Sequence, residues 1–138
     1  MSMIHVDIVS ATESLYSGTA KCVFAPGNSG ELGIYPQHLP LLSTLRPGEV
    51  RVETESGVES IYVSGGIVEV QPTVVTIFSD TAIRAYDLDE SKALEAKQRA
   101  EDEMANADTD QDITSTQAAL AESMAQLQLI SKMRGKKR

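Results

Sequence analysis

Residues 60–78 read SIYVSGGIVEVQPTVVTIF, and this stretch decides the fold class. It holds three short runs rich in β-branched residues, at 60–63, 67–70 and 74–78, separated by Ser64-Gly65-Gly66 and by Pro72-Thr73. Short runs divided by turn residues, with no helical stretch between them, predict antiparallel strands joined by tight turns. The glycine pair is better interpreted as a strand connection than as a phosphate cradle, because no helix N-terminus follows it.

Similar runs lie on the N-terminal side of this stretch. Residues 4–9 alternate apolar and polar side chains, as a half-buried strand does, and further runs lie at 20–24 and 50–53. Together they predict a two-layer antiparallel β-sandwich or flattened barrel over residues 1–86. The turns expected between these runs are Pro26-Gly27-Asn28, Pro47-Gly48 and Ser56-Gly57.

The composition changes after Tyr86. All six aromatic residues and all five prolines lie in residues 1–86, whereas residues 87–138 are rich in Ala, Leu, Met, Glu, Lys and Gln. These residues favour helices. A polar break at 106–112 divides this segment, so the sequence predicts an α+β chain in which 87–138 form a two-helix hairpin.

The predicted hairpin has a clear start but little apolar surface. Asp87 and Asp89 are candidates to cap the first helix, and Glu90 falls in its first turn, where the helix dipole favours an acid. Ordering each residue costs about 1–2 kcal/mol, and alanine offers few methylene groups to offset it. We therefore expect a hairpin that is separable from the sandwich and can adopt alternative packings. The apolar stripes predicted for the two helices are Ala93, Leu94, Ala96, Ala100 and Met104, followed by Leu120, Met124, Leu127 and Ile130.

Charge and cysteine content exclude several classes of protein. A net charge of −8 argues against a nucleic-acid binder. The C-terminal end is basic, which indicates either an acidic partner or a solvated terminus. Cys22 is the only cysteine, so an intrachain disulfide or cysteine-rich metal site is impossible, and a buried thiol in a reducing compartment is expected. The sequence offers neither a signal peptide nor the roughly 20 consecutive apolar residues of a membrane span, so no direct membrane insertion is expected.

Catalytic motifs are also missing from the sequence. We find no nucleophile elbow, no HExxH and no P-loop, and two histidines and one cysteine offer few reactive constellations. The chain is therefore expected to be non-catalytic. Two kinds of binding protein remain: a subunit of a larger assembly, or a free-standing ATP-sensing regulatory protein.

The densest motif is GELGIYPQHLPLL at 30–42. Its two glycines permit tight turns, and its two prolines fix the backbone on either side of His38. We expect a stiff loop that presents Tyr35, His38 and Leu39 outward. Stiff apolar loops bind well because they lose little entropy on binding.

This motif resembles the epsilon subunit family of bacterial F-type ATP synthase. The resemblance extends to YVSGGIVEVQP at 62–72, DTAIR at 80–84 and LDE at 88–90, and it covers essentially the full chain in order. It implies a non-catalytic rotor subunit, peripheral on the cytoplasmic face of the bacterial inner membrane. Such a subunit links the gamma subunit to the c-ring, and its mobile C-terminal helices inhibit ATP hydrolysis by the alpha and beta subunits.

The resemblance also assigns partner contacts to individual residues. Glu31 takes the position of the c-ring contact, while His38, with Tyr35 and Leu39, takes the position facing the gamma subunit. From the residues alone, Glu31 is equally a solvated turn acid, and His38 equally a loop histidine with one backbone hydrogen bond. His5 has no such assignment and is expected to be structural. The residues that would contact the catalytic head are Lys132, Arg134, Lys136, Lys137 and Arg138.

Residues 88–93 match the family's regulatory ATP-binding pattern with one difference. Lys92 stands where the pattern has arginine, and a lysine offers a point charge in place of a planar fork. Asp89, Lys92 and Arg99 would share one helical face that could approach phosphates. No cofactor is required, and regulatory ATP is an expectation beside the simpler interpretation of an N-cap acid with a surface ion pair.

Overall fold

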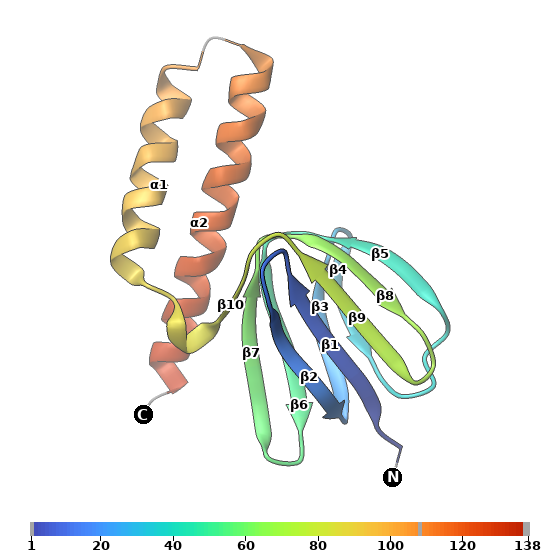
Figure 1. Cartoon of the computed structure of the whole chain (residues 1–138). Helices are drawn as coiled ribbons and strands as arrows, with labels where there is room; N and C mark the ends of the chain where they lie inside the picture. The colour runs from blue at the N-terminus through green and yellow to red at the C-terminus, as the bar shows by residue number, and fades with distance from the viewer. Residues whose placement is uncertain (1, 108, 137–138) are drawn as a thin grey trace. The chain divides into compact units, whose positions relative to one another are not determined.

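The computed structural model describes residues 2–107 and 109–136. It divides into two compact units, of which the first ends at Arg84 and the second begins at Ala85. The first unit is built from β-strands and the second from helices (Figure 1). Within the described residues, no helix is long and apolar enough to cross a bilayer.

The first unit is one sheet that curls around its own interior. In the described residues the strands follow the order β10-β7-β6-β3-β5-β8-β9-β1-β2, and β4 pairs with β3 beside this path. Pairing is antiparallel except between β1 and β9, which are parallel. The strands are β1 (Ile4–Ser10), β2 (Ser14–Ala20), β3 (Cys22–Gly27), β4 (Gly30–Ile34), β5 (Leu41–Leu45), β6 (Gly48–Thr54), β7 (Gly57–Val63), β8 (Gly66–Val70), β9 (Val74–Ser79) and β10 (Ala82–Arg84).

The two ends of this strand order meet through a side chain. Arg84 of β10 donates a hydrogen bond from Nη2 to the Leu15 carbonyl of β2, at 2.8 Å. This contact ties the last strand of the unit to the second. The sheet is therefore a nearly closed barrel, which confirms the predicted sandwich or flattened barrel.

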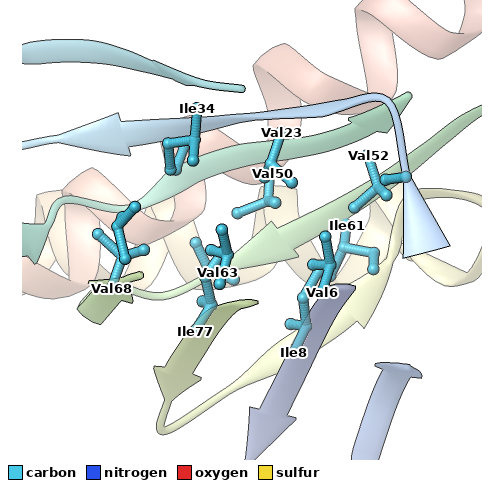
Figure 2. Packing of buried hydrophobic residues seen from close by; sticks show 14 of the residues in the cluster. Val6, Ile8, Val23, Ile34, Val50, Val52, Ile61, Val63, Val68 and Ile77 are labelled. Carbon is cyan, nitrogen blue, oxygen red and sulfur yellow. The ribbon is translucent and has the colours of Figure 1, made fainter. Parts of the chain in front are cut away.

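The interior of the barrel is filled by aliphatic side chains from the inward face of each strand (Figure 2). Alternation decides which residues point inward: Val50 and Val52 of β6 are fully buried, while Arg51 between them faces out. Every member of this core cluster precedes Arg84. The first unit thus has a complete hydrophobic core of its own.

Four of the described strands were not predicted from the sequence: β2, β4, β5 and β10. The predicted run at 20–24 was wrong in its boundaries, because Lys21 separates β2 from β3. The turn predicted at Pro26-Gly27-Asn28 begins later, since Pro26 and Gly27 close β3. The predicted strand connection at Gly65 and Gly66 is confirmed: both adopt positive φ (114° and 132°), a conformation that glycine tolerates.

The second unit is a helical hairpin preceded by a short 3-10 turn. The turn η1 (Ala85–Asp87) contains Asp87, which therefore does not cap the helix. Asp89 is the N-cap of α1 (Glu90–Ala105), and its side chain accepts a hydrogen bond from the Lys92 N–H at 3.1 Å. After a break shorter than predicted, α2 (Asp110–Lys136) begins; the two helices lie side by side in Figure 1.

The seam between the two helices is made mainly of small residues. Ala93 and Ala100 of α1 are buried, as predicted, but Leu94 is 51% exposed. On α2 the predicted stripe was wrong at Met124, which is 45% exposed, while Thr116 and Ser123 are buried instead. Both buried hydroxyls bond carbonyls of their own helix, Asp112 O at 2.7 Å and Ala119 O at 3.0 Å. They add no hydrogen bond between the helices. Leu129 and Met133 of α2, which the predicted stripe did not include, are buried as well.

Candidate functional site

The outer face of β3, β4 and β6 carries a cluster of side chains that contains Glu31. Phe24 of β3 lies opposite Gly33 of β4 and opposite Arg51 of β6 in the strand register. The Arg51 guanidinium carbon lies 4.6 Å from the centroid of the Phe24 ring. Arg51 Nη1 also lies 3.5 Å from Glu31 Oε2. Glu31 is therefore the second residue of β4, directly after a turn, and it is exposed to solvent beside Arg51.

Tyr35, immediately after β4, completes this cluster. Its ring meets the Phe24 ring edge to face, with centroids 6.1 Å apart and an interplanar angle of 87°. Gly33 leaves space for this pair, because a Cβ at that position would lie 3.2 Å from the Phe24 ring. The Tyr35 side chain is 54% exposed, so the cluster ends in an accessible aromatic ring.

Cys22 lies beside Tyr35 on the same outer face. It is 4% exposed yet is not a member of the interior core cluster. Burial, followed by the nearby Glu53 carboxylate, raises the pKa of the Cys22 thiol. The neighbouring sulfur in turn raises the pKa of the Tyr35 hydroxyl. The prediction of a buried thiol is confirmed.

The loop that follows β4 is shorter than the sequence suggested. The predicted stiff loop at 30–42 was wrong at both ends, because β4 and β5 occupy them. Gln37 adopts a positive φ of 66°, a turn conformation uncommon outside glycine. Leu39 is 80% exposed, as predicted, but His38 is only half-buried, and its Nδ1 lies 2.7 Å from the Leu39 carbonyl. One ring nitrogen of His38 is thus engaged by the loop itself.

A second apolar surface lies on the outer face of β8 and β9. Ile67 of β8 lies opposite Phe78 of β9 in the strand register, and both side chains are about half exposed. Together with Val9, Gly65 and Gly66, these two residues line a groove of about 390 Å³. Exposed apolar groups gathered this way mark interaction sites in soluble proteins. The exposure of Ile67 and Phe78 was not predicted from the sequence.

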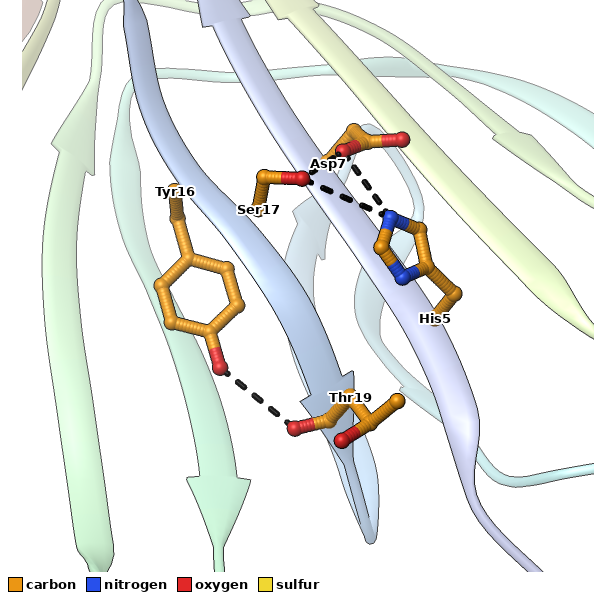
Figure 3. A network of polar contacts seen from close by, with 5 residues as sticks. All are labelled: His5, Asp7, Tyr16, Ser17 and Thr19. Atoms are coloured by element: carbon orange, nitrogen blue, oxygen red, sulfur yellow. Dashed lines mark hydrogen bonds and ion pairs between the residues drawn. The ribbon is translucent and has the colours of Figure 1, made fainter.

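A polar network joins β1 to β2 on the outer face (Figure 3). Ser17 Oγ donates to Asp7 Oδ1 at 2.7 Å, and His5 Nε2 lies 3.1 Å from the same oxygen and 3.5 Å from Ser17 Oγ. A nucleophilic triad needs acid and nucleophile on opposite ring nitrogens, and here both lie at Nε2. The hydrogen bond from Ser17, aided by His5, holds the pKa of Asp7 below its ordinary value. The network is structural, as expected for His5.

The two ends of the hairpin are joined by an ion pair. Arg134 Nη2 of α2 lies 2.5 Å from Glu90 Oε2 in the first turn of α1. Both side chains are substantially exposed, 67% and 43% respectively. Of the other predicted basic residues, Lys132 is exposed on α2 and Lys136 is the last residue of that helix. Lys137 and Arg138 lie outside the described residues.

The three residues predicted to bind ATP are spread along α1. The Asp89 carboxylate is engaged as the N-cap, which matches the simpler interpretation. Arg99 lines a hollow at the other end of the hairpin with Asp102, Asp112 and Ser115. Seven residues of helix, about 10 Å at 1.5 Å per residue, separate Lys92 from Arg99.

The residue that sequence reasoning missed is Arg51. A signal was available, because alternation in β6 directs Arg51 outward between two buried valines. Its partner Glu31 is 20 positions away, and only the strand register brings the two together. Phe24, the platform for Arg51, was read only as part of a strand.

The chain combines a barrel that exposes apolar and charged surfaces with a separate helical hairpin. This architecture defines a two-part binding protein. Family models support this class: residues 3–85 match the beta-sandwich domain of the ATP synthase delta/epsilon chain, and residues 87–131 match its long alpha-helix domain. The chain belongs to the ATP synthase delta/epsilon family, a non-catalytic subunit of that complex.

Individual relatives agree with this membership. The chain is 77% identical, over 99% of both sequences, to the ATP synthase epsilon chain of Vesicomyosocius okutanii. A chain in the Euglena gracilis mitochondrial ATP synthase, described as OSCP/F1/c-ring, has a TM-score of 0.80 at 23% identity, covering 91% of this chain and 79% of that one. A chain in the Tetrahymena thermophila central stalk/c-ring structure has a TM-score of 0.70 at 15% identity, covering 94% and 97%. These two likenesses show the fold.

Proposed function

We propose that the chain is a rotor subunit of the proton-translocating F-type ATP synthase, linking the gamma subunit to the c-ring. The observation that carries this proposal is the 77% identity to an epsilon chain along both units of the fold. The solved assemblies that share the fold are a central stalk with c-ring and an F1 with c-ring. The chain would then be peripheral on the cytoplasmic face of the bacterial inner membrane.

The barrel would supply the rotor contacts. Glu31 would contact the c-ring, and Tyr35, His38 and Leu39 the gamma subunit. The exposure of Tyr35 and Leu39, at 54% and 80%, supports a contact role, because large apolar side chains on a surface gain most from being covered.

The helical unit would act as a brake on ATP hydrolysis. The small buried residues support this role. Beside Leu129 and Met133 the hairpin buries alanines and hydroxyls, which offer less apolar area than the aliphatic core of the barrel. The basic end of α2 would then contact an acidic surface on the alpha and beta subunits. Each exposed ion pair contributes only about 0.2–1 kcal/mol, but several together could bias a two-state arm. The residues concerned are Lys132, Arg134, Lys136, Lys137 and Arg138.

Co-purification tests the assembly role. A tagged chain is recovered from detergent-solubilised membranes, and the co-purifying subunits are identified and quantified. We expect the gamma subunit and c-ring to be retained. Leu39→Ala should lower that yield, while the control Val58→Ala, at another exposed apolar residue of the same unit, leaves it unchanged. Recovery of the chain alone would favour the second candidate, a free-standing ATP-sensing protein.

Regulatory ATP binding is a separate proposal that involves Asp89, Lys92 and Arg99. A lysine cannot form the bidentate contacts that an arginine makes with phosphate. Calorimetric titration of the purified chain with ATP should therefore give weak binding that Lys92→Arg strengthens. Absence of heat for both proteins at millimolar ATP would remove this proposal and leave the rotor role intact.

A further inference from the structure

We propose that Arg51 is a positioning residue for the contact made by Glu31. It holds the carboxylate on the outer face of the barrel in one orientation before any partner binds. The inference rests on the proposed c-ring contact of Glu31, and it adds to that contact a residue with no assigned role.

The arginine is itself fixed by its surroundings. Its guanidinium lies over the Phe24 ring at 4.6 Å, and an arginine stacked on an aromatic face is stabilised by the cation–π interaction. The Phe24 ring also makes an edge-to-face contact with Tyr35. Gly33 permits this arrangement, since a side chain there would press on the Phe24 ring. Three strand or strand-end positions, Phe24, Gly33 and Tyr35, therefore determine where Arg51 points.

Glu31 is held at one oxygen and left accessible at the surface. The ion pair joins Arg51 Nη1 to Glu31 Oε2, and the Glu31 side chain is 53% exposed. Freezing the rotamers of a glutamate costs binding free energy, and a partner that meets an ordered carboxylate avoids part of that cost. The surface thus fits a partner segment that offers hydrogen-bond donors to a fixed acceptor.

A purely structural role for Arg51 would have different consequences for binding. If Arg51 only stabilises the barrel, its removal lowers the unfolding midpoint and leaves the effect of Glu31→Gln on binding unchanged. If it positions Glu31, the two substitutions are coupled, because each removes one half of the same ordered group. The double-mutant cycle distinguishes these roles.

The experiment measures rebinding of the purified full-length chain to ATP synthase depleted of it. The concentration for half-maximal rebinding is determined for E31Q, R51Q, the double variant and R51K. Glu55→Gln and Arg46→Gln, at exposed positions of the same unit, serve as charge-matched controls. The unfolding midpoint of every variant is recorded so that a misfolded chain is recognised.

We expect R51Q to weaken rebinding about two- to five-fold, the range for one exposed charged pair. The double variant should be no weaker than E31Q, and R51K should recover part of the loss, because it keeps the charge without the planar fork. Unchanged or tighter rebinding by R51Q, with E31Q still weakened, would overturn this inference and leave the proposed function standing. No effect of E31Q would overturn the Glu31 contact and the inference with it.

Discussion

At the scale of single residues, glycines occupy the positions of the barrel where neighbouring atoms leave no room for a side chain. Charged side chains connect strands that are far apart in the sequence. Gly33 has an ordinary strand conformation and is required for space, whereas Gly66 is required for both space and conformation. Arg84 closes the barrel, and Asp7 fastens its first hairpin. These roles depend on neighbours distant in sequence, so each yields a test in the folded protein.

Gly66→Ala should destabilise the barrel severely. A Cβ at Gly66 would collide with the Phe78 backbone carbonyl, and its φ of 132° is strained for any side chain. We expect a loss of more than about 3 kcal/mol, as strain and overpacking add. Gly57→Ala is the control: its φ is 136°, but the space around it is open. Urea unfolding that gave equal losses for both would contradict the collision.

Asp7→Asn should lower stability in a pH-dependent way. Because folding lowers the pKa of Asp7, its contribution is present above the ordinary value of 3.8 and is lost as the pH falls through the folded value. We expect a deficit of less than about 1 kcal/mol at pH 7, since the group is partly exposed. Urea unfolding should show the two proteins converging well below pH 3.8. A deficit that persisted there would show that the charged form of the Asp7 carboxylate does not account for the loss of stability.

At the scale of elements, the sequence predicted those strands that alternate cleanly and the hairpin whose composition is helical. It missed β4 and β5 because glycines and prolines at 30–42 indicate a loop. Pairing of β4 with β3 and of β5 with β8 makes both ends of that segment strands. The α2 stripe was wrong at Met124 because buried hydroxyls satisfied within their own helix replace apolar groups. The contact role proposed for Glu31 came from the family resemblance. The proximity of Arg51 to Glu31 could be recognised only from the strand register.

The ion pair at the base of the hairpin predicts an unusual effect for Glu90→Gln. Removing the acid releases Arg134, so the hairpin should open about two- to five-fold more often while the basic end is free to bind the catalytic head. ATP hydrolysis by the enzyme carrying this variant should therefore fall below the wild-type rate. Hydrogen exchange in the first turn of α1 reports the opening.

Two variants provide the comparison for this prediction. Arg134→Gln also loosens the hairpin but removes a basic residue, so it should not strengthen inhibition. Glu95→Gln changes the same charge at an exposed position on α1. If Glu90→Gln and Glu95→Gln had the same hydrolysis rate, the ion pair would have no part in the brake.

At the scale of the whole molecule, the two units have cores of different quality. The barrel encloses a complete aliphatic core before Arg84. The described part of the hairpin buries mostly small residues beside Leu129 and Met133, and it has an exposed ion pair between Glu90 and Arg134. A firm unit suits a permanent contact with a rotor, and a weakly held one suits regulation. The central claim is that the helical unit, and not the barrel, restrains hydrolysis.

The most direct measurement is the ATP hydrolysis rate of the enzyme reassembled with a chain that ends after Tyr86. We expect that this chain folds and rebinds, that proton pumping remains coupled to hydrolysis, and that the hydrolysis rate rises above the rate with the full chain. An unchanged hydrolysis rate with the shortened chain bound would contradict it.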